Sequence, residues 1–238
     1  MPSKRTYASR DSSGREYTKK RTAVNRPSYI RPVSGGISAV SNRASLGTQK
    51  SVEFLYVEQG VALSSSVGIP AVYQFNASGL FDPNRTGTGH QPMNYDQLMV
   101  LYEDYIVTEC EYKVVFRQSD NNPALIGVTV SDATTVATDT KVLIENGQCQ
   151  WDQIRGTVET PVHRTMKGKI DIAKCHGVTR SQLLGDAEFR GTVGANPVDM
   201  IILNVFAAST STGSPTVSFT IELRFKAVLR GSKLNSLS

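Results

Sequence analysis

Cysteine, histidine and tryptophan are scarce in this chain, which has three cysteines, three histidines and one tryptophan among 238 residues. Cys110, Cys149 and Cys175 are odd in number, widely spaced and form no CxxC pair. A disulfide framework needs more cysteines, and a structural zinc site needs paired ligands at short spacing. We therefore expect three reduced thiols.

Long apolar runs are also missing, and no stretch approaches the roughly 20 residues of a membrane span. The first residues have no apolar segment of the kind that secretory signals carry. An arginine-rich, acid-poor start is shared with organelle transit peptides, but this one has no amphipathic apolar face. We expect neither membrane insertion nor secretion.

No constellation of catalytic residue types converges in the sequence. Cys175 and His176 are adjacent, and on a strand they would point to opposite faces. They would therefore make a poor nucleophile and base pair. His163 has no evident partner, so we expect a protein that is not an enzyme.

Acidic residues are nearly absent from the first fifty positions. Eleven lysines and arginines stand there against Asp11 and Glu16, a net charge of +9. The rest of the chain has fifteen basic and nineteen acidic residues, a net charge of −4. So strong an asymmetry points to a polyanionic partner for the first segment.

The composition predicts three parts: a disordered basic arm and linker (1–47), one domain (48–231) and a short C-terminal tail (232–238). The arm has too few aliphatic side chains to offset the entropy of ordering it. Pro27 and Pro32 exclude a continuous helix there.

The arm is the candidate nucleic-acid-binding segment, because a flexible cationic chain contacts phosphates without reading bases. The cations expected to do so are Lys4, Arg5, Arg10, Arg15, Lys19, Lys20, Arg21, Arg26 and Arg31. Tyr7, Tyr17 and Tyr29 lie among them and could stack on unpaired bases. Lys19, Lys20 and Arg21 also fit a nuclear localisation signal, and a purely solubilising tail is the remaining alternative.

Beyond residue 50, alternating and β-branched residues predict strands. In the last one, alternate residues from Val217 to Leu229 are apolar, and the residues between them, apart from Val228, are polar or charged. Eight strands are expected, at 51–63, 69–77, 109–117, 124–131, 148–158, 165–174, 198–208 and 217–230.

One helix is predicted after the loop 82–92. Asn94 is its candidate N-cap and Gln97 the partner in a capping box. Apolar residues then recur at helical spacing from Tyr95 to Tyr105. A second short helix is expected at Val178–Leu184.

Eight antiparallel strands with uneven connections favour an all-β fold: a single eight-stranded jelly-roll sandwich preceded by the disordered basic arm. The short helix falls between the second and third predicted strands, which are strands C and D of a jelly roll. An immunoglobulin-like sandwich is the main rival. Trp151 does lie between Cys110 or Cys149 and Cys175, but the strand context does not fit the Cys–Trp–Cys signature of that fold.

The stretch Leu80–Pro92, with T-G-T-G-H-Q-P at its end and the helix from Tyr95 after it, resembles the capsid proteins of small circular Rep-encoding single-stranded DNA viruses. Lys167–Lys174 with Gly177 resembles a further segment of that family. The likeness spans roughly residues 50–230.

This resemblance implies a jelly-roll coat protein. About sixty copies of it would form a T=1 icosahedral shell around a single-stranded DNA genome. It places the protein in the virion, with assembly in the host nucleus. Similar jelly rolls occur in coat proteins of small positive-strand RNA viruses, such as the tombusvirus-like group, so the type of genome stays open.

The distinctive loop is expected to be structural, and its residues are Thr86, Gly87, Thr88, Gly89, His90, Gln91 and Pro92. His90 is expected to make a hydrogen bond within it. The two glycines superficially resemble a phosphate-binding loop, but no lysine follows them.

No resident cofactor is expected, although calcium between subunits stays open, because Ca²⁺ takes several oxygen ligands that one subunit need not supply. The candidate carboxylates are Asp82, Asp132, Asp186 and Asp199. Subunit contacts are expected from loops 78–92, 119–123, 132–148 and 185–197. The alternative from another class is a lectin-like or cytokine-like binding module, which would normally follow the secretory route.

Overall fold

Alternation of apolar and polar residues, interrupted only at Val228, builds β11 (Thr216–Ser232), which is as long as any other described strand. Seven alternate side chains of this strand, from Val217 to Leu229, are buried. Burial of a large aliphatic or aromatic side chain contributes about 1.5–3 kcal/mol, so this one face anchors the strand to a core. The predicted division of the strand into a buried and a wet face is confirmed.

The computed structural model describes residues 9–10, 16–17, 48–87, 89–118, 120–157 and 160–233. Contacts divide the chain into two units, Met1–Ala44 and Ser45–Ser238. In the first unit, β1 (Ser9–Arg10) pairs antiparallel with β2 (Glu16–Tyr17), where the sequence predicted no strand. The predicted disorder of the other arm residues lies outside the described part of the chain.

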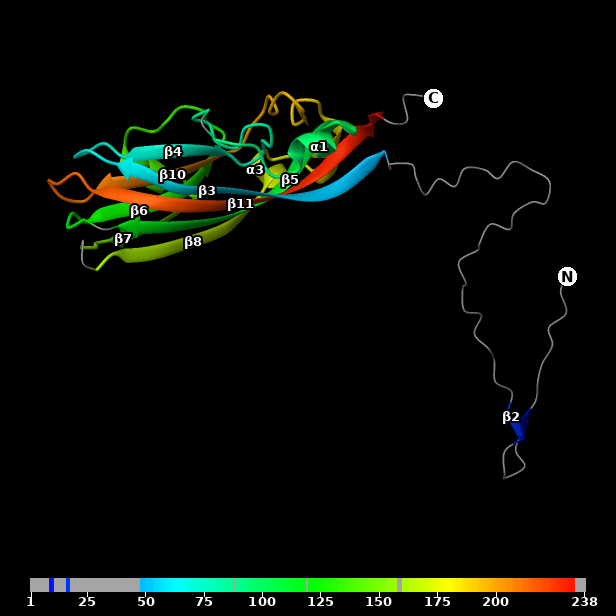
Figure 1. Ribbon diagram of the computed structural model, residues 1–238, viewed down its shortest axis with the longest axis horizontal. Coiled ribbons are helices and arrows are strands. Elements are labelled where there is room, and N and C mark those ends of the chain that lie inside the picture. Colours follow the sequence, from blue (N-terminus) through cyan, green and yellow to red (C-terminus); the bar gives the residue numbers. More distant parts are fainter. Residues whose placement is uncertain are drawn as a thin grey trace. The chain divides into compact units, whose positions relative to one another are not determined.

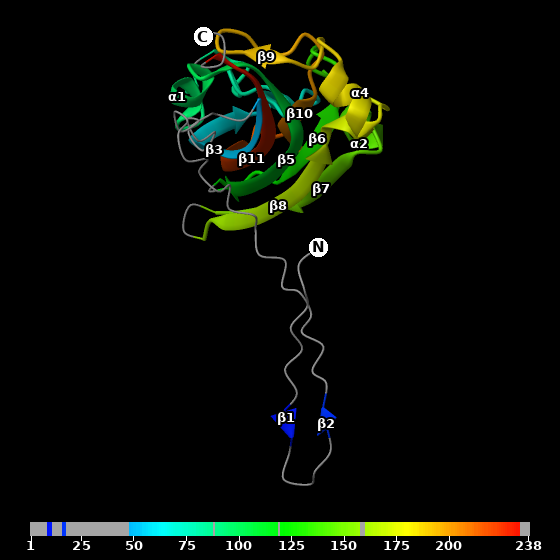
Figure 2. The same cartoon turned by 90° about the vertical axis from the view of Figure 1, so that its right-hand side faces the viewer.

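The second unit contains two antiparallel sheets. One has the order β4-β10-β6-β7 and the other β3-β11-β5-β8 (Figures 1 and 2). Their bounds are β3 Gln49–Ser64, β4 Ala71–Asn76, β5 Tyr102–Gln118, β6 Ala124–Ser131, β7 Cys149–Ile154, β8 Val162–Asp171 and β10 Ile202–Ser209. Every connection between these strands crosses from one sheet to the other, except that from β6 to β7. This strand order is that of a jelly roll, so the fold prediction is confirmed.

The predicted helix is shorter than expected. α1 (Tyr95–Met99) does lie between strands C and D, which are β4 and β5, but it ends well before Tyr105. Tyr102 and Tyr105 belong to β5, where they pair with Ser232 and Leu229 of β11 and are buried. Ladder pairing and burial thus outweigh the helical spacing. Asn94 has a left-handed backbone (φ 66°) and makes no side-chain cap, so the predicted capping box is wrong.

The second predicted helix is confirmed as α4 (Arg180–Gly185), and a capping box between Thr179 and Gln182 begins it. The sequence missed α2 (Thr140–Glu145) and α3 (Ile172–Cys175). α3 replaces the end of the strand predicted at 165–174, because the Asp171 side chain accepts a hydrogen bond from Lys174 N and starts a helix there. A two-residue strand, β9 (Gly191–Thr192), pairs with β5.

The core lies between the sheets and is rich in aromatic rings. Phe219 of β11 contacts Phe75 of β4 and Phe116 of β5, each with ring centroids 6.1 Å apart. A smaller cluster lies on the outer face of β6 and β10, where Leu143 of α2 packs with Leu125 and Phe206. The loop that carries α2 therefore covers this outer face. The outer face of the other sheet carries charged side chains that are exposed or half-exposed.

Strand register places the connections at two ends of the sandwich. Ile202 pairs with both Asn76 and Ser131, so the long connections 77–101, 132–148 and 172–201 leave from one end. The short connections 65–70, 119–123, 155–161 and 210–215 lie at the other end. Of the loops predicted to make subunit contacts, 119–123 is thus separated from the other three.

Candidate functional site

Most of the predicted nucleic-acid-binding residues fall outside the described part of the chain. Arg10 lies in β1, directly opposite Glu16 of β2 in register. Lys4, Arg5, Arg15, Lys19, Lys20, Arg21, Arg26 and Arg31 lie outside the described residues, and so does the predicted nuclear localisation signal. Tyr17 belongs to β2, whereas Tyr7 and Tyr29 are also outside.

The residues that lead into the distinctive loop contact β3 and β4 through the buried side chain of Asn84. The Asn84 amide nitrogen donates to the Tyr73 hydroxyl at 2.9 Å, and its oxygen accepts from Thr86 N at 3.0 Å and Thr86 Oγ1 at 2.7 Å. The Tyr56 hydroxyl donates to Glu58 Oε2 at 2.5 Å, and Asn84 lies 3.4 Å from the same oxygen. Burial and the Glu58 carboxylate both raise the pKa of Tyr56, which keeps this phenol a donor.

The two glycines of the loop have separate structural reasons. Gly87 has φ +73°, a left-handed conformation that side chains other than glycine rarely adopt. A Cβ at Gly89 would lie 2.5 Å from Asn84 Cβ and 2.7 Å from the Tyr56 hydroxyl oxygen. The chain passes so close to Asn84 and Tyr56 that Gly89 has no room for a side chain. Thr88 lies outside the described residues.

His90 joins the loop to β3. Its Nδ1 lies 2.8 Å from the Gln91 carbonyl oxygen, and its Nε2 lies 3.1 Å from the Val57 carbonyl oxygen. The hydrogen bond to Gln91 is the main cause that raises the pKa of His90. Both ring nitrogens are thus engaged by backbone oxygens.

Gln91 and Pro92 lead from the loop into α1. With its nitrogen directed toward Asp96, the Gln91 amide donates to both oxygens of that carboxylate, at 2.8 and 3.0 Å. The Pro92 carbonyl accepts from Tyr95 N at 3.1 Å. These contacts start the short helix in place of the expected Asn94 cap.

Asn196 joins the connection 172–201 to the residues that follow β4, a contact that the sequence did not predict. Its side-chain oxygen accepts from Phe81 N at 3.1 Å, Asp82 N at 3.2 Å and the Tyr105 hydroxyl at 3.2 Å. Its nitrogen donates to the Asp82 carbonyl at 3.1 Å. The nearby signal was the Asn-Pro dipeptide, which predicts a turn but not a contact more than a hundred residues away.

Cys175 and His176 do not lie on a strand, which corrects the expectation that they point to opposite faces of one. Cys175 is the last residue of α3, and His176 follows it as the C-cap. The His176 side chain is only 7% exposed, and its Nδ1 lies 4.0 Å from Asp199 Oδ2. Its ring packs against that of Phe189, with centroids 4.7 Å apart and planes tilted by 43°. Desolvation lowers the pKa of His176, whereas the negative charges of Asp199 and Asp132 act to raise it.

The three cysteines are free thiols. Cys110 is fully buried, and Cys149 and Cys175 line a cavity of about 590 Å³ together with Tyr112, Lys169 and Lys174. Burial raises the pKa of the Cys149 thiol to about 11. Such a thiol is protonated near neutrality and is a weak nucleophile.

The carboxylates proposed for calcium are spread over several connections. Asp82 follows β4, Asp132 follows β6, and Asp186 and Asp199 lie between α4 and β10. Burial raises the pKa of Asp82, and the Asp186 side chain accepts from Glu188 N at 3.2 Å. Within the described ranges, no group of three or more His, Cys, Asp or Glu side chains is placed to hold a metal ion.

None of the described helices is both long and apolar enough to cross a membrane.

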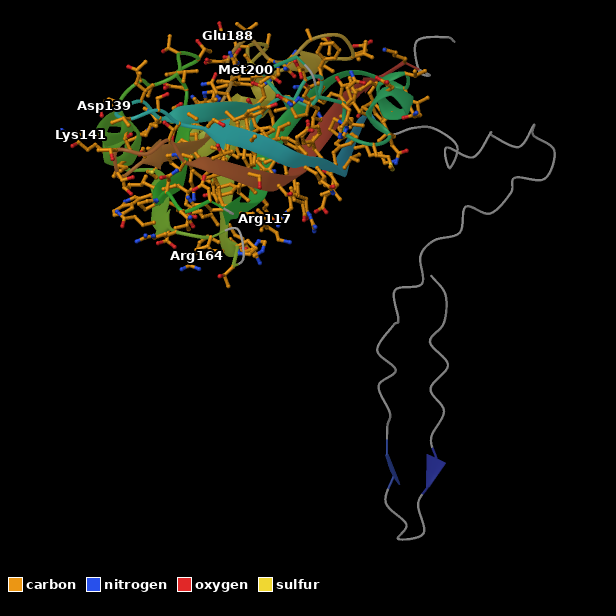
Figure 3. The ribbon with its side chains drawn as sticks, turned by 60° about the vertical axis from the view of Figure 1, so that its left-hand side comes forward. Arg117, Asp139, Lys141, Arg164, Glu188 and Met200 are labelled. Carbon is orange, nitrogen blue, oxygen red and sulfur yellow. The ribbon has the colours of Figure 1, made fainter. Side chains whose placement is uncertain are left out.

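The outer face of β11, β5 and β8 carries most of the cross-strand ion pairs found among the described residues. Lys226 Nζ and Lys169 Nζ each lie 2.6 Å from a carboxylate oxygen of Glu109. Hydrogen bonds from these two lysines lower the pKa of Glu109. At the sheet edges, Arg164 of β8 reaches Asp152 of β7 at 3.0 Å and links the two sheets. Figure 3 shows Arg164 and Arg117 on the same lower side of the body.

No family model matches the sequence, and no curated protein matches it. Solved structures similar to the chain include Desmodium yellow mottle tymovirus (12% identity, 90% of this chain and 99% of that chain, TM-score 0.40). They also include a virus-like particle of the nodavirus of the prawn Macrobrachium rosenbergii (8% identity, 80% and 98%, TM-score 0.46) and mud crab tombus-like virus (10% identity, 78% and 90%, TM-score 0.43). The jelly-roll assignment stands on the strand order itself.

Proposed function

We propose that this chain is the coat protein of a small virus, and that copies of it assemble into an icosahedral shell that encloses a single-stranded genome. The observation that carries the proposal is the pairing of a complete jelly-roll body with a preceding segment of net charge +9. The similar solved structures are named for viruses, which agrees with this role. The role is structural, not enzymatic.

In this proposal, the arm neutralises the genome. If about sixty copies assemble, their arms bring about 540 positive charges to the interior, enough to offset a similar number of phosphates. Contact with the backbone alone does not select a sequence, so packaging specificity is not expected from the arm.

The genome is proposed to be single-stranded DNA, from the likeness of the Thr86–Pro92 loop to circular Rep-encoding viruses, with single-stranded RNA as the alternative. Assembly in the host nucleus accompanies the DNA assignment, with Lys19, Lys20 and Arg21 as the import signal. Fusion of residues 1–47 to a fluorescent protein tests that signal. The fusion protein should accumulate in the nucleus, and a Lys19→Gln, Lys20→Gln, Arg21→Gln variant should not.

The first experiment is negative-stain microscopy of the purified full-length protein, together with the A260/A280 ratio and nuclease digestion of the extracted cargo. Uniform spheres that contain nuclease-sensitive nucleic acid support the proposal. Sensitivity to DNase or RNase indicates the cargo, and particles from infected material exclude host RNA acquired during expression. A monomer or trimer that stays free of nucleic acid and does not assemble when salt is lowered contradicts it and favours the lectin-like or cytokine-like alternative.

No resident cofactor is proposed; calcium between subunits is the alternative, with Asp82, Asp132, Asp186 and Asp199 as candidate ligands from neighbouring copies. Particles treated with a calcium chelator should then swell or dissociate, and added Ca²⁺ but not Mg²⁺ should restore them. Particles that keep their sedimentation coefficient in the chelator contradict this part of the proposal.

A further inference from the structure

Charged residues on the outer face of the sheet β3-β11-β5-β8 are arranged in rows that cross three strands. In one row, Arg224 of β11 pairs with Glu111 of β5, which pairs with Lys169 of β8. An acid lies between two cations there. In the next row, Glu222 pairs with Lys113, and Lys113 pairs with Lys167. Two lysines are therefore directly opposite each other on adjacent strands.

Both carboxylates of these rows already have cationic partners, and none of these partners is Lys167. Glu222 lies 3.2 Å from Arg224 and 3.9 Å from Lys113. Glu111 lies 3.4 Å from Lys226 and 4.0 Å from Lys169. Across the described ranges, no carboxylate lies within 4.0 Å of the Lys167 ammonium group.

These side chains line a shallow groove of about 470 Å³, called here the basic groove. Its charged lining is Lys113, Lys167, Lys169 and Arg224 against Glu111 and Glu222. The side chains of Lys113, Lys169 and Arg224 are 46%, 55% and 49% exposed, so their charged ends reach solvent. Four cations against two carboxylates leave the groove with a net positive charge.

A like-charge pair directly opposite on one face of a sheet destabilises the sheet. Natural sequences keep such local conflicts mainly at functional sites. An external anion over Lys113 and Lys167 converts the repulsion into two attractions. The geometry therefore calls for an anionic partner, and the exposed lysines suit phosphate because an ammonium group binds it as a point charge.

We propose that the basic groove binds phosphate groups of a nucleic-acid strand, as a second site on the body besides the arm. The proposal rests on the proposed packaging function. Charge complementarity selects the partner, and the groove contacts the backbone and not the bases. β8 is an edge strand, so a nucleic-acid strand can lie over the groove and continue past the sheet. Arg117, exposed on the same strand and face as Lys113, extends the positive surface.

The test compares salt dependence of binding for three full-length variants. The probes are fluorescein-labelled oligo(dT) and oligo(U), measured by fluorescence anisotropy from 50 to 300 mM salt. The groove variant is Lys113→Gln with Lys167→Gln. The matched control, Lys141→Gln with Arg180→Gln, removes the same charge from exposed positions on α2 and α4; Figure 3 shows Lys141 far from Arg117. The third variant is Lys19→Gln, Lys20→Gln, Arg21→Gln in the arm.

Each phosphate contact to a single strand contributes about 0.7 to the slope of log affinity against log salt. The groove variant should therefore lower the magnitude of the slope by about 1.4 on both probes, and the control should leave it unchanged. A thermal midpoint no lower than that of the parent shows that the loss is not unfolding. Protection of Lys167, but not of Lys141, from acetylation when oligo(dT) is bound supports the same conclusion.

Three results overturn the proposal in distinguishable ways. If the arm variant lowers the slope but the groove variant matches its control, packaging by the arm stands and the groove proposal is wrong. If the parent protein binds neither probe at 50 mM salt, the packaging function itself fails, and the groove proposal fails with it. Binding of an acidic peptide such as oligoglutamate with equal affinity and equal loss in the groove variant also overturns it, because the groove then recognises carboxylate and not phosphate.

Discussion

The imidazole ring of His90 packs against the phenol ring of Tyr56, with ring centroids 4.7 Å apart and ring planes tilted by 33°. Each nitrogen of that imidazole lies within hydrogen-bond distance of a backbone carbonyl oxygen, one of Gln91 and one of Val57. A carbonyl only accepts, so both hydrogen bonds form together only when the ring is doubly protonated. The raised pKa of His90 follows from this arrangement, with the bond to Gln91 as its largest cause.

The first prediction concerns His90→Gln. Because the folded-state pKa is raised, the stability that His90 contributes is fully present below its unfolded pKa of about 6.5 and is lost as pH rises through the folded value. The variant should lower the free energy of unfolding of the unassembled chain by about 1 kcal/mol at pH 5.5 and by clearly less at pH 9. Urea denaturation at the two pH values measures the difference. Equal losses at both would show that the imidazolium is not the bonded form.

The second prediction concerns the tight passage at Gly89. Gly89→Ala places a methyl group against Asn84 and Tyr56 and should destabilise the chain by about 1–3 kcal/mol. Gly194→Ala is the matched control, since no atom lies within 4 Å of its added Cβ, and it should change stability by less than about 0.5 kcal/mol. Thermal denaturation of both variants checks the pair. Indistinguishable midpoints would mean that the loop is not packed on β3 in solution.

The strands were predictable because their signal is local. In β11 and β5, alternate residues face one core, so the period of two in the sequence directly marks the buried face. All eight main strands appear near their predicted positions, and their crossing connections give the jelly roll. Helix boundaries were less predictable: Tyr102 and Tyr105 fit a helical period as well as a strand, and only pairing with β11 decides between them.

The candidate sites were predictable only in part, because they depend on contacts between distant residues. The sequence marks the Thr86–Pro92 loop. It does not show that Asn196, in the connection 172–201, binds Phe81 and Asp82 at the start of the connection 77–101. It shows alternating charges on β5 and β8, but the juxtaposition of Lys113 and Lys167 needs the register of two strands that are separated by two others along the chain. No local pattern contains that register.

The third prediction concerns His176, whose titration acts in the opposite direction to that of His90. Its ring is buried against Phe189 and faces Asp199 and Asp132, and its Nε2 has no hydrogen-bond partner among the described residues. Because desolvation lowers its pKa, the neutral ring is favoured in the folded state, and stability is lost as pH falls through the unfolded pKa of about 6.5.

His176→Leu keeps an apolar contact with Phe189 and removes the titration. The parent should lose more free energy of unfolding between pH 7 and pH 5 than this variant does, by about 1 kcal/mol. Urea denaturation over this range gives the two slopes, and measurements in the His90→Gln background separate the two histidines. Parallel pH profiles for parent and His176→Leu would contradict the prediction.

The last prediction concerns Trp151, the single tryptophan of the chain. It lies on β7, an edge strand, opposite Gly127 of β6, and it is 51% exposed. Val142 of the neighbouring α2 is 59% exposed. Tryptophan is enriched among the residues that contribute most to protein interfaces, and half-exposed aromatic surface beside apolar neighbours marks a contact site.

Trp151→Ala should therefore change the free energy of unfolding by no more than about 1 kcal/mol while raising the protein concentration needed for shell assembly at least tenfold. Light scattering of titrated protein measures that concentration. Trp151→Tyr, which keeps an aromatic ring, should recover most of the assembly, whereas normal assembly of Trp151→Ala would place the subunit contacts on another surface.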